Sequence, residues 1–200
     1  MPIAILALAL GTFGIGTTEF VIMGMLPQVG GDLGVDVPTA GQYVSSYAIG
    51  VVVGAPLLTA ATVRLPRRWT LVGLMALFTL GNLLSALAPT HEALLATRFL
   101  SGLPHGAFFG VGVLVAASLV SPQRRGRAMA AVMLGLSVAN VVGVPAGTYI
   151  AQQFGWRWTF GAIALIGLAA MTAVAAFAPR QDTARASGSI RAELAAFARP

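Results

Sequence analysis

The stretch Arg98-Phe-Leu-Ser-Gly102-Leu-Pro104-His105-Gly106-Ala-Phe-Phe-Gly110 places a guanidinium and an imidazole near the start of an apolar run. That run, roughly residues 93–119, is long enough to cross a bilayer as a helix. Ionisable side chains inside a membrane are costly, and they usually face a partner or a water-filled cavity. Arg98, Gly102, His105 and Phe109 are spaced to share one helical face. We therefore expect this face to point into a helix bundle rather than toward lipid.

The composition indicates an integral membrane protein. The chain has 200 residues, of which 57% are hydrophobic and 9% are charged. Cysteine is absent, which excludes disulfides and cysteine-ligated metal sites. The net charge of +6 comes from arginines in short loops between apolar runs. This placement favours membrane topology over a nucleic-acid partner.

The apolar runs predict an all-α membrane protein with six transmembrane helices within residues 1–178. The expected helices span roughly 3–26, 40–62, 69–88, 93–119, 128–150 and 159–178. Pro27 is expected to end the first helix, and 27–39 and 152–157 are expected to be loops. Residues 179–200 are expected to form a polar linker, with a short amphipathic helix over 189–199.

The arginines predict the orientation of the chain in the membrane. With the N-terminus inside, Arg157 is the only arginine of the outer loops. The inner loops and the tail then hold Arg64, Arg67, Arg68, Arg124, Arg125, Arg127, Arg180, Arg185, Arg191 and Arg199. Because cytoplasmic loops carry the excess of basic residues, both termini are expected in the cytoplasm.

Small residues recur at four-residue spacing in two of the expected helices. Gly50 and Gly54 predict a close approach of the 40–62 helix to a neighbour. Gly135, Ala139, Gly143 and Gly147 predict a second packing ridge in the 128–150 helix. Proline inside a helix removes a backbone hydrogen bond, so a kink is expected near Pro145.

Glu19 and Arg98 lie at similar depths from the outer ends of their helices, so a pair between them, direct or through water, is a candidate site. The alternative for Arg98 is snorkelling to the outer head groups, which its long stem allows. Glu19 has a short stem, so a functional role is the better interpretation of a carboxylate at this depth.

Other polar residues of the helices have two interpretations each. His105 either relays protons along the face of Arg98 or only packs and hydrogen-bonds a carbonyl. Asn140 either joins helices or contacts substrate. Tyr47 is a candidate cavity residue, whereas Tyr43 lies near the outer edge and is expected to be an aromatic-belt anchor.

The sequence offers no support for enzymatic chemistry. His91-Glu92 begins like a zinc-protease helix, but the second histidine is missing. The chain has neither a Gly-x-Ser-x-Gly elbow nor a phosphate-binding Gly-Lys-Ser/Thr loop. We therefore expect no enzyme activity, no cofactor and no metal.

Four motifs in order resemble a known family. They are Gly16-Thr-Thr-Glu19-Phe-Val-Ile-Met-Gly24-Met-Leu-Pro27, Tyr47-Ala-Ile-Gly50-Val-Val-Val-Gly54-Ala-Pro56, the Arg98–Gly110 stretch and Gly143-Val-Pro145-Ala-Gly147. Together they are similar to the N-terminal six-helix half of a major facilitator superfamily transporter. The closest branch resembles the drug:proton antiporters, among bacterial exporters of the arabinose-efflux and chloramphenicol-resistance kind.

The resemblance implies roles for individual residues. Arg98 would line the central cavity and take part in proton coupling, and Glu19 would bind a proton or a cationic substrate. Gly143, Pro145 and Gly147 match a helix motif of antiporters at the interface with the other half.

The family's cytoplasmic gating loop is only partly kept. Its arginine positions match Arg64, Arg67 and Arg68, but Val63 stands at the place of its aspartate. Thr59 and Pro66 stand at its two glycine places. The charge relay attributed to that aspartate cannot be made by valine, so gating on this side must be weaker or rest on other groups.

The resemblance also implies a second, C-terminal six-helix half, so the chain is expected to be a fragment or one half of an assembly. The implied function is proton-coupled efflux of a small amphipathic drug or of a sugar- or nucleoside-like metabolite. The implied partners are the lipid bilayer, protons, a small-molecule substrate and the missing half. The alternatives are a non-transporting six-span scaffold or fragment, and one half of a homo- or heterodimeric transporter.

Overall fold

A computed structural model describes residues 2–179 of the chain, which are helical with short connections and contain no strand. The α-helices are α1 Ile3–Val21, α2 Leu26–Leu33, α3 Val37–Ala40, α4 Gln42–Thr62, α5 Arg67–Ala86, α6 His91–Gly102, α7 Pro104–Ser118, α8 Arg125–Val138, α9 Val144–Phe154 and α10 Trp156–Phe177. Short 3-10 turns at Ile22–Gly24 and Pro122–Arg124 and a π-helical turn at Ala139–Gly143 connect some of them.

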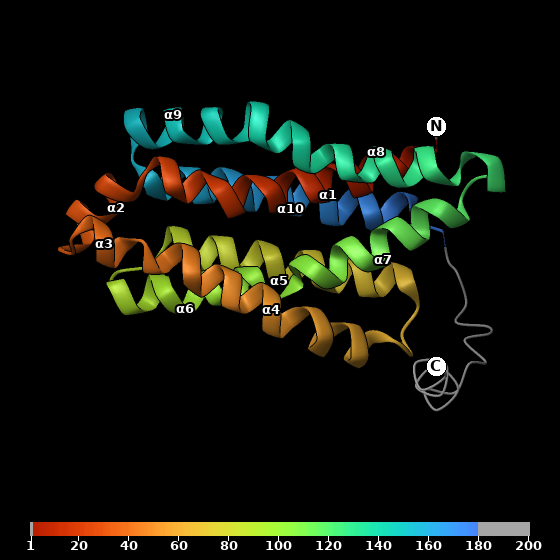
Figure 1. The fold of residues 1–200 in the computed structure, drawn as a ribbon, viewed down its shortest axis with the longest axis horizontal. Coiled ribbons are helices and arrows are strands. Elements are labelled where there is room, and N and C mark those ends of the chain that lie inside the picture. The colour runs from red at the N-terminus through yellow and green to blue at the C-terminus, as the bar shows by residue number, and fades with distance from the viewer. Residues whose placement is uncertain (1, 180–200) are drawn as a thin grey trace, which may run out of the picture.

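Six helical stretches are long and apolar enough to cross a membrane: Ile3–Gly24, Val37–Thr62, Arg67–Ala86, His91–Ser118, Pro122–Phe154 and Trp156–Phe177. This confirms the predicted all-α, six-span fold. The spans run side by side along the long axis, and the start of α1 lies at the same end as the end of α10 (Figure 1). α5 packs along α10, α1 packs against α8 and α10, and α4 packs on α6 and α7.

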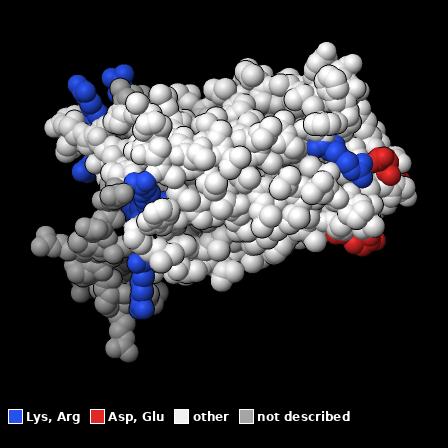
Figure 2. Space-filling model, turned by 180° about the vertical axis from the view of Figure 1, so that it is seen from behind, with Lys and Arg blue, Asp and Glu red and all other residues white. Residues whose placement is uncertain are grey.

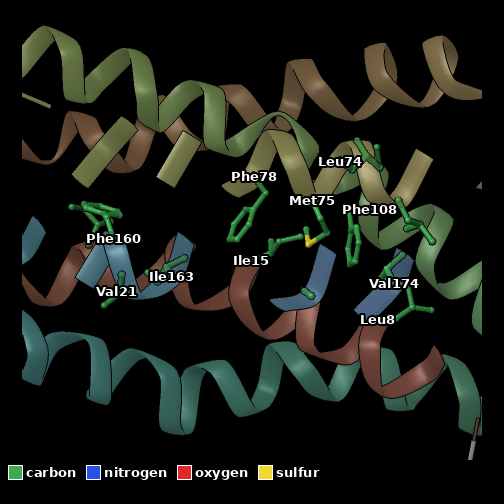
Figure 3. Packing of buried hydrophobic residues seen from close by; sticks show 14 of the residues in the cluster. Leu8, Ile15, Val21, Leu74, Met75, Phe78, Phe108, Phe160, Ile163 and Val174 are labelled. Carbon is green, nitrogen blue, oxygen red and sulfur yellow. The ribbon is translucent and has the colours of Figure 1, made fainter. Parts of the chain in front are cut away.

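The core is formed by large apolar side chains from several spans around α1. Ile15 of α1 lies beside Met75 and Phe78 of α5, and Phe108 of α7 lies nearby (Figure 3). All four side chains are fully buried. This apolar packing fixes the position of α1, which carries Glu19, relative to the helix pair that carries Arg98 and His105.

The contact between α4 and α6 requires glycine. A Cβ atom at Gly50 would lie 2.2 Å from the carbonyl oxygen of Phe99, and one at Gly54 would lie 2.1 Å from that of Leu103. A Cβ at Gly102 would lie 2.3 Å from the carbonyl oxygen of Tyr47. The predicted close approach at Gly50 and Gly54 is confirmed, and Gly102 contributes to it from the partner helix.

The fifth span packs on α1 through its glycines. A Cβ at Gly135 would lie 2.1 Å from Thr12 Oγ1, and one at Gly143 would lie 2.2 Å from Thr17 Oγ1. The π-helical turn Ala139–Gly143 interrupts this span just before Pro145, which lies in the first turn of α9. The irregularity expected near the proline is therefore a local π-turn between α8 and α9.

Two expected loops are wrong. Residues 27–39 contain α2 and α3, because Pro27 lies in the first turn of α2, where its fixed φ favours a helix. Gly34 ends α2 in the left-handed conformation, with φ of 71°. The expected loop 152–157 reduces to Gly155, whose φ of 99° turns the chain between α9 and α10.

The expected helix over 93–119 is divided into α6 and α7 at Leu103, directly before Pro104. The helix expected over 189–199 and the tail arginines lie outside the described residues. Basic side chains gather at one end of the bundle, and acidic side chains lie at the other end beside a single basic group (Figure 2).

Candidate functional site

Arg98 is fully buried and points into the bundle. Its Nη1 donates to the carbonyl oxygen of Thr18 at 3.0 Å and lies 3.3 Å from the Thr18 hydroxyl. Its Nε donates to the carbonyl oxygen of Tyr43 at 3.4 Å. The guanidinium lies 4.5 Å from the centre of the Tyr47 ring and 5.7 Å from that of Phe160. Arg98 therefore joins α1, α4 and α10, and it does not snorkel.

The direct Glu19–Arg98 pair is not formed. Arg98 binds the backbone of Thr18, the residue before Glu19. Successive side chains leave a helix about 100° apart, so the Glu19 carboxylate points elsewhere. Its Oε2 lies 4.0 Å from Nδ1 of His105. The Glu19 side chain is 29% exposed and that of His105 is 14% exposed, whereas Arg98 is fully buried.

His105 lies between Glu19 and Tyr47. The Tyr47 hydroxyl lies 3.1 Å from Nδ1 of His105, the same nitrogen that faces Glu19. A neutral imidazole with Nδ1 unprotonated accepts from the Tyr47 hydroxyl, whereas a proton on Nδ1 makes that nitrogen a donor to the carboxylate. The three side chains can therefore hold a proton on the carboxylate or on the imidazole. Phe109 stacks on the imidazole at 4.9 Å and shields its other side.

Arg98 and His105 lie on the same side of their span, as their spacing predicts, because both contact Tyr47. Their span is nevertheless broken at Leu103, so the shared side runs across the junction of α6 and α7. Gly102 makes this possible because its missing side chain lets the backbone of Tyr47 approach.

A supporting polar layer was not predicted from the sequence. The Thr18 hydroxyl donates to Oδ1 of Asn82 at 2.5 Å, and Nδ2 of Asn82 donates to the carbonyl oxygen of Phe78 at 2.9 Å. Thr18 therefore joins Arg98 to α5. Threonine in an apolar run is common, so its neighbourhood to Glu19 is the only sequence signal that could have singled it out.

Tyr43 is not a membrane-surface anchor, and that prediction was wrong. Its side chain is fully buried, and its hydroxyl lies 2.8 Å from Nδ1 of His91, the first residue of α6. Its carbonyl oxygen also accepts from Arg98. Tyr43 is drawn inward because α4 and α6 approach closely at their glycines, which brings its ring against α6.

Asn140 and the glycine–proline motif lie on the fifth span. Asn140 is exposed, and its Nδ2 donates to the carbonyl oxygen of Leu136 in its own span, so it does not join two helices. Gly143 and Gly147 pack against Thr17 and Val21 of α1. The two glycines therefore hold the span to α1 within one helical turn of Glu19, on both sides of it, and Asn140 faces outward.

The loop arginines divide into two groups. Arg64 and Arg67 are exposed, whereas Arg68 is half-buried and donates to the carbonyl oxygen of Ala175 near the end of α10. The Arg68 guanidinium also lies 5.6 Å from the ring centre of Trp69. Arg68 therefore ties the start of α5 to the end of α10.

A second polar cluster at the opposite end joins α2 to α10. Nε1 of Trp156 donates to Asp32 at 3.0 Å, and Arg157 donates to the same oxygen and, through Nη2, to the carbonyl oxygen of Ala88 at 3.1 Å. The hydrogen bond from Arg157, followed by that from Trp156, lowers the pKa of Asp32. The sequence did not predict this cluster because it placed Asp32 and Trp156 in loops.

Nothing in the described part of the chain resembles a metal centre, since residues 2–179 contain no group of three His, Cys, Asp or Glu side chains placed to hold an ion. The candidate site instead consists of the buried Arg98 guanidinium and the partly exposed Glu19–His105 pair, which share Tyr47 as a neighbour.

Comparison with known proteins gives extensive similarity. The Major Facilitator Superfamily profile matches residues 8–199. Inner membrane transport protein YdhP of Escherichia coli K12 is 46% identical over 98% of this chain and 50% of its own length. The putative transporter AraJ of the same organism is 43% identical, covering 90% of this chain and 45% of its own length.

The chloramphenicol resistance protein of Streptomyces lividans is 38% identical over 100% of this chain and 52% of its own length. The chain thus spans about half the length of the curated relatives that it matches. A crystal structure of a D-xylose–proton symporter superimposes with a TM-score of 0.79 at 17% identity, covering 97% of this chain and 51% of that one. At this identity the likeness concerns the fold alone.

Proposed function

This chain belongs to the major facilitator superfamily, a family of membrane transporters rather than enzymes, and we propose that it forms the N-terminal six-helix bundle of a proton-coupled exporter. A C-terminal six-helix bundle would complete the central cavity, with substrate held between the two bundles near the middle of the membrane. The proposed substrate is a small amphipathic drug or a sugar- or nucleoside-like metabolite. The name of the Streptomyces lividans relative, a chloramphenicol resistance protein, supports the hypothesis that the substrate is a drug and makes chloramphenicol the first probe.

The observation that carries the proposal is the Glu19–His105 pair. A carboxylate within a span is costly to keep unless it has a partner or a function, and Glu19 is both partly exposed and 4.0 Å from an imidazole. Protonation of Glu19 would remove its charge and release His105 to Tyr47. Protonation would also remove the negative charge of Glu19 from the surroundings of the buried Arg98. Such a change in attraction between α1 and the α6–α7 span would bias the bundle toward one orientation.

Three further features support the same proposal. Gly143 and Gly147 hold the fifth span against α1. Exposed residues of the same motif and span, among them Pro145 and Val141, which is 75% exposed, would face the second bundle. Arg64, Arg67 and Arg68 would act at the inner mouth, where only Arg68 has a helix partner among the described residues. The gathering of arginines at one end supports cytoplasmic termini (Figure 2).

The test is transport by the native protein in liposomes with an imposed proton gradient and chloramphenicol as the probe. Glu19→Gln is expected to reduce gradient-driven transport to the level of protein-free liposomes, because glutamine cannot carry the proton. Glu92→Gln is the matched control, since Glu92 lies in the first turn of α6, away from Glu19 and His105. Equal rates for Glu19→Gln and the unmodified protein would refute the coupling role.

The intact mass of the native protein tests the missing bundle. A mass about twice the 20.5 kDa of this chain is expected for a two-bundle transporter. A mass of 20.5 kDa would favour a six-span scaffold or a transporter assembled from separate halves. Transport activity of the 20.5 kDa species would then favour a transporter assembled from separate halves, and no transport activity would favour the scaffold.

A further inference from the structure

A cavity of about 760 Å³ opens at the arginine-rich end of the bundle, away from Glu19 and His105. It lies between the start of α1, the connection after α7 and the first turns of α8. Its walls are mostly apolar, with Ile5, Val120, Ala131 and Leu134 among them, and Arg124 and Arg127 line it as well. Its size falls within the range of about 300–1,000 Å³ that is usual for small-molecule sites.

One face of the fifth span builds the cavity. Arg124, Arg127, Ala131 and Leu134 recur at three- or four-residue intervals, so the two guanidinium groups stand above an apolar strip on the same side. Leu134, the deepest of them along the span, is 58% exposed. The cavity therefore has a cationic rim, formed by Arg124 and Arg127, and an apolar floor, formed by Ala131 and Leu134, that extends from the rim along the helix.

Among residues 2–179, the cationic rim has no carboxylate counter-ion. The carboxylates of residues 2–179 are Glu19 inside the bundle and Asp32, Asp36 and Glu92 near the opposite end. On the face shown in Figure 2, no acidic group of the described residues lies beside the basic groups of the arginine-rich end. Both ion pairs of the described chain, His105–Glu19 and Arg157–Asp32, lie elsewhere.

We propose that this cavity binds an anionic glycerophospholipid of the surrounding leaflet. The phosphate would lie between Arg124 and Arg127, whose planar guanidinium groups suit phosphate oxygens, and an acyl chain would follow the apolar strip toward Leu134. Basic pockets between transmembrane helices on the cytoplasmic side are suited to acidic lipid head groups. The site is separate from the transport pathway and does not depend on it.

Charge argues against the chain's own tail as the occupant. Residues 180–200 contain Arg180, Arg185, Arg191 and Arg199 against Asp182 and Glu193, so the segment is itself net positive. A cationic segment would be repelled by Arg124 and Arg127, whereas an anionic lipid would be attracted. A second protein bundle over the cavity is the other occupant that the experiment distinguishes.

The absence of cysteine allows a single reporter to be placed in the cavity. Leu134→Cys in the full chain would carry an environment-sensitive fluorophore, with the protein in phosphatidylethanolamine nanodiscs. Either brominated phosphatidylglycerol or additional brominated phosphatidylethanolamine would then be titrated as quencher. Quenching by phosphatidylglycerol is expected at much lower content, because only this lipid carries the net charge that the rim attracts.

Arg124→Gln/Arg127→Gln is expected to raise the phosphatidylglycerol content for half-maximal quenching about thirtyfold, since two arginines near a membrane surface contribute about that factor. The control Arg64→Gln/Arg67→Gln removes the same charge from the same end outside the cavity and is expected to leave the value unchanged. A second variant, Ala131→Phe, fills the floor without changing charge and is expected to weaken quenching. Ala176→Phe, on exposed α10 surface, serves as its control.

Three results would overturn the proposal. Equal quenching by the two lipids would remove the anionic preference. Equal effects of Arg124→Gln/Arg127→Gln and Arg64→Gln/Arg67→Gln on quenching would show only a general attraction of the lipid to the basic surface. Protection of the fluorophore from both lipids would mean that protein, either the tail or a second bundle, covers the cavity.

Discussion

Gly102→Ala is the most direct perturbation of the α4–α6 contact. The added Cβ would lie 2.3 Å from the carbonyl oxygen of Tyr47, 3.2 Å from its carbonyl carbon and 3.2 Å from the backbone nitrogen of Val51. These are backbone atoms of α4, so no side-chain rotation can relieve the overlap. Restoring an ordinary contact requires the helices to separate by about 1 Å, which forfeits a quarter to a half of the dispersion energy across the contact.

The free energy of unfolding should fall accordingly. Overpacking a well-packed site costs about 1–3 kcal/mol, and the upper value applies because the obstacle is rigid. Alanine regains about 1 kcal/mol of helix propensity over glycine, so about 2 kcal/mol of destabilisation remains. For a chain of this size that lowers the Tm by about 4–8 °C. The separation would also lengthen the 3.1 Å contact between the Tyr47 hydroxyl and His105.

The assay is thermal unfolding followed by circular dichroism, with all variants in the same detergent. Gly110→Ala is the matched control, because it makes the same substitution in α7 where an added Cβ meets nothing within 4 Å. It should be neutral or raise the Tm slightly. If Gly102→Ala and Gly110→Ala unfold at the same temperature, the close approach of α4 and α6 is not what glycine provides at position 102.

Two further changes test the polar clusters. Thr18→Val removes an acceptor of Arg98 and the donor to Asn82. Because these buried polar groups lose a partner, the free energy of unfolding should fall by about 2 kcal/mol, measured by thermal unfolding. A loss no larger than that of Thr172→Val, on an exposed α10 surface, would contradict this. Asp32 has its pKa lowered by Arg157 and Trp156, so its ionised form stabilises the fold above the unfolded pKa of about 4 and this contribution is lost as pH falls through the lower folded value. The Tm of Asp32→Asn should therefore fall less than that of the unmodified chain on acidification below about pH 4, and identical acid dependence would show that the cluster does not stabilise the fold.

The helices themselves could be predicted because the bilayer imposes a length on them. Each apolar run long enough to span became a span, and the family resemblance from the motifs around Glu19, Gly50, Arg98 and Gly143 is confirmed by the profile match. The short helix α2 was not predicted, because Pro27 was expected to end the first helix and residues 27–39 were expected to form a loop. Proline in the first turn and glycine just past the last are instead the normal ends of a helix.

The pairing of the site residues could not be predicted from depth alone. Depth along two helices correctly brought Glu19 and Arg98 to one region but carried no information on rotation about the helix axis. Neighbouring residues of α1 point about 100° apart around the helix axis. This rotation is enough for Arg98 to bind Thr18 while the Glu19 carboxylate faces His105. Tyr43 was misplaced for a related reason, since the distance between α4 and α6 depends on glycines of both helices.

The two basic side chains of the α6–α7 span, Arg98 and His105, differ in what surrounds them, and this difference bears on their proposed roles. Arg98 has no exposed surface, and it donates to the backbone carbonyls of Thr18 and Tyr43 and to the Thr18 hydroxyl, groups that do not change charge with pH. A group so fixed holds three helices in register and supplies a constant positive field. His105 is partly exposed, and its Nδ1 faces both a carboxylate and a phenol hydroxyl. We therefore propose that protons exchange at Glu19 and His105 while Arg98 stays in place, so that Arg98 acts as a positioning residue and the Glu19–His105 pair as the titrating element of the exporter.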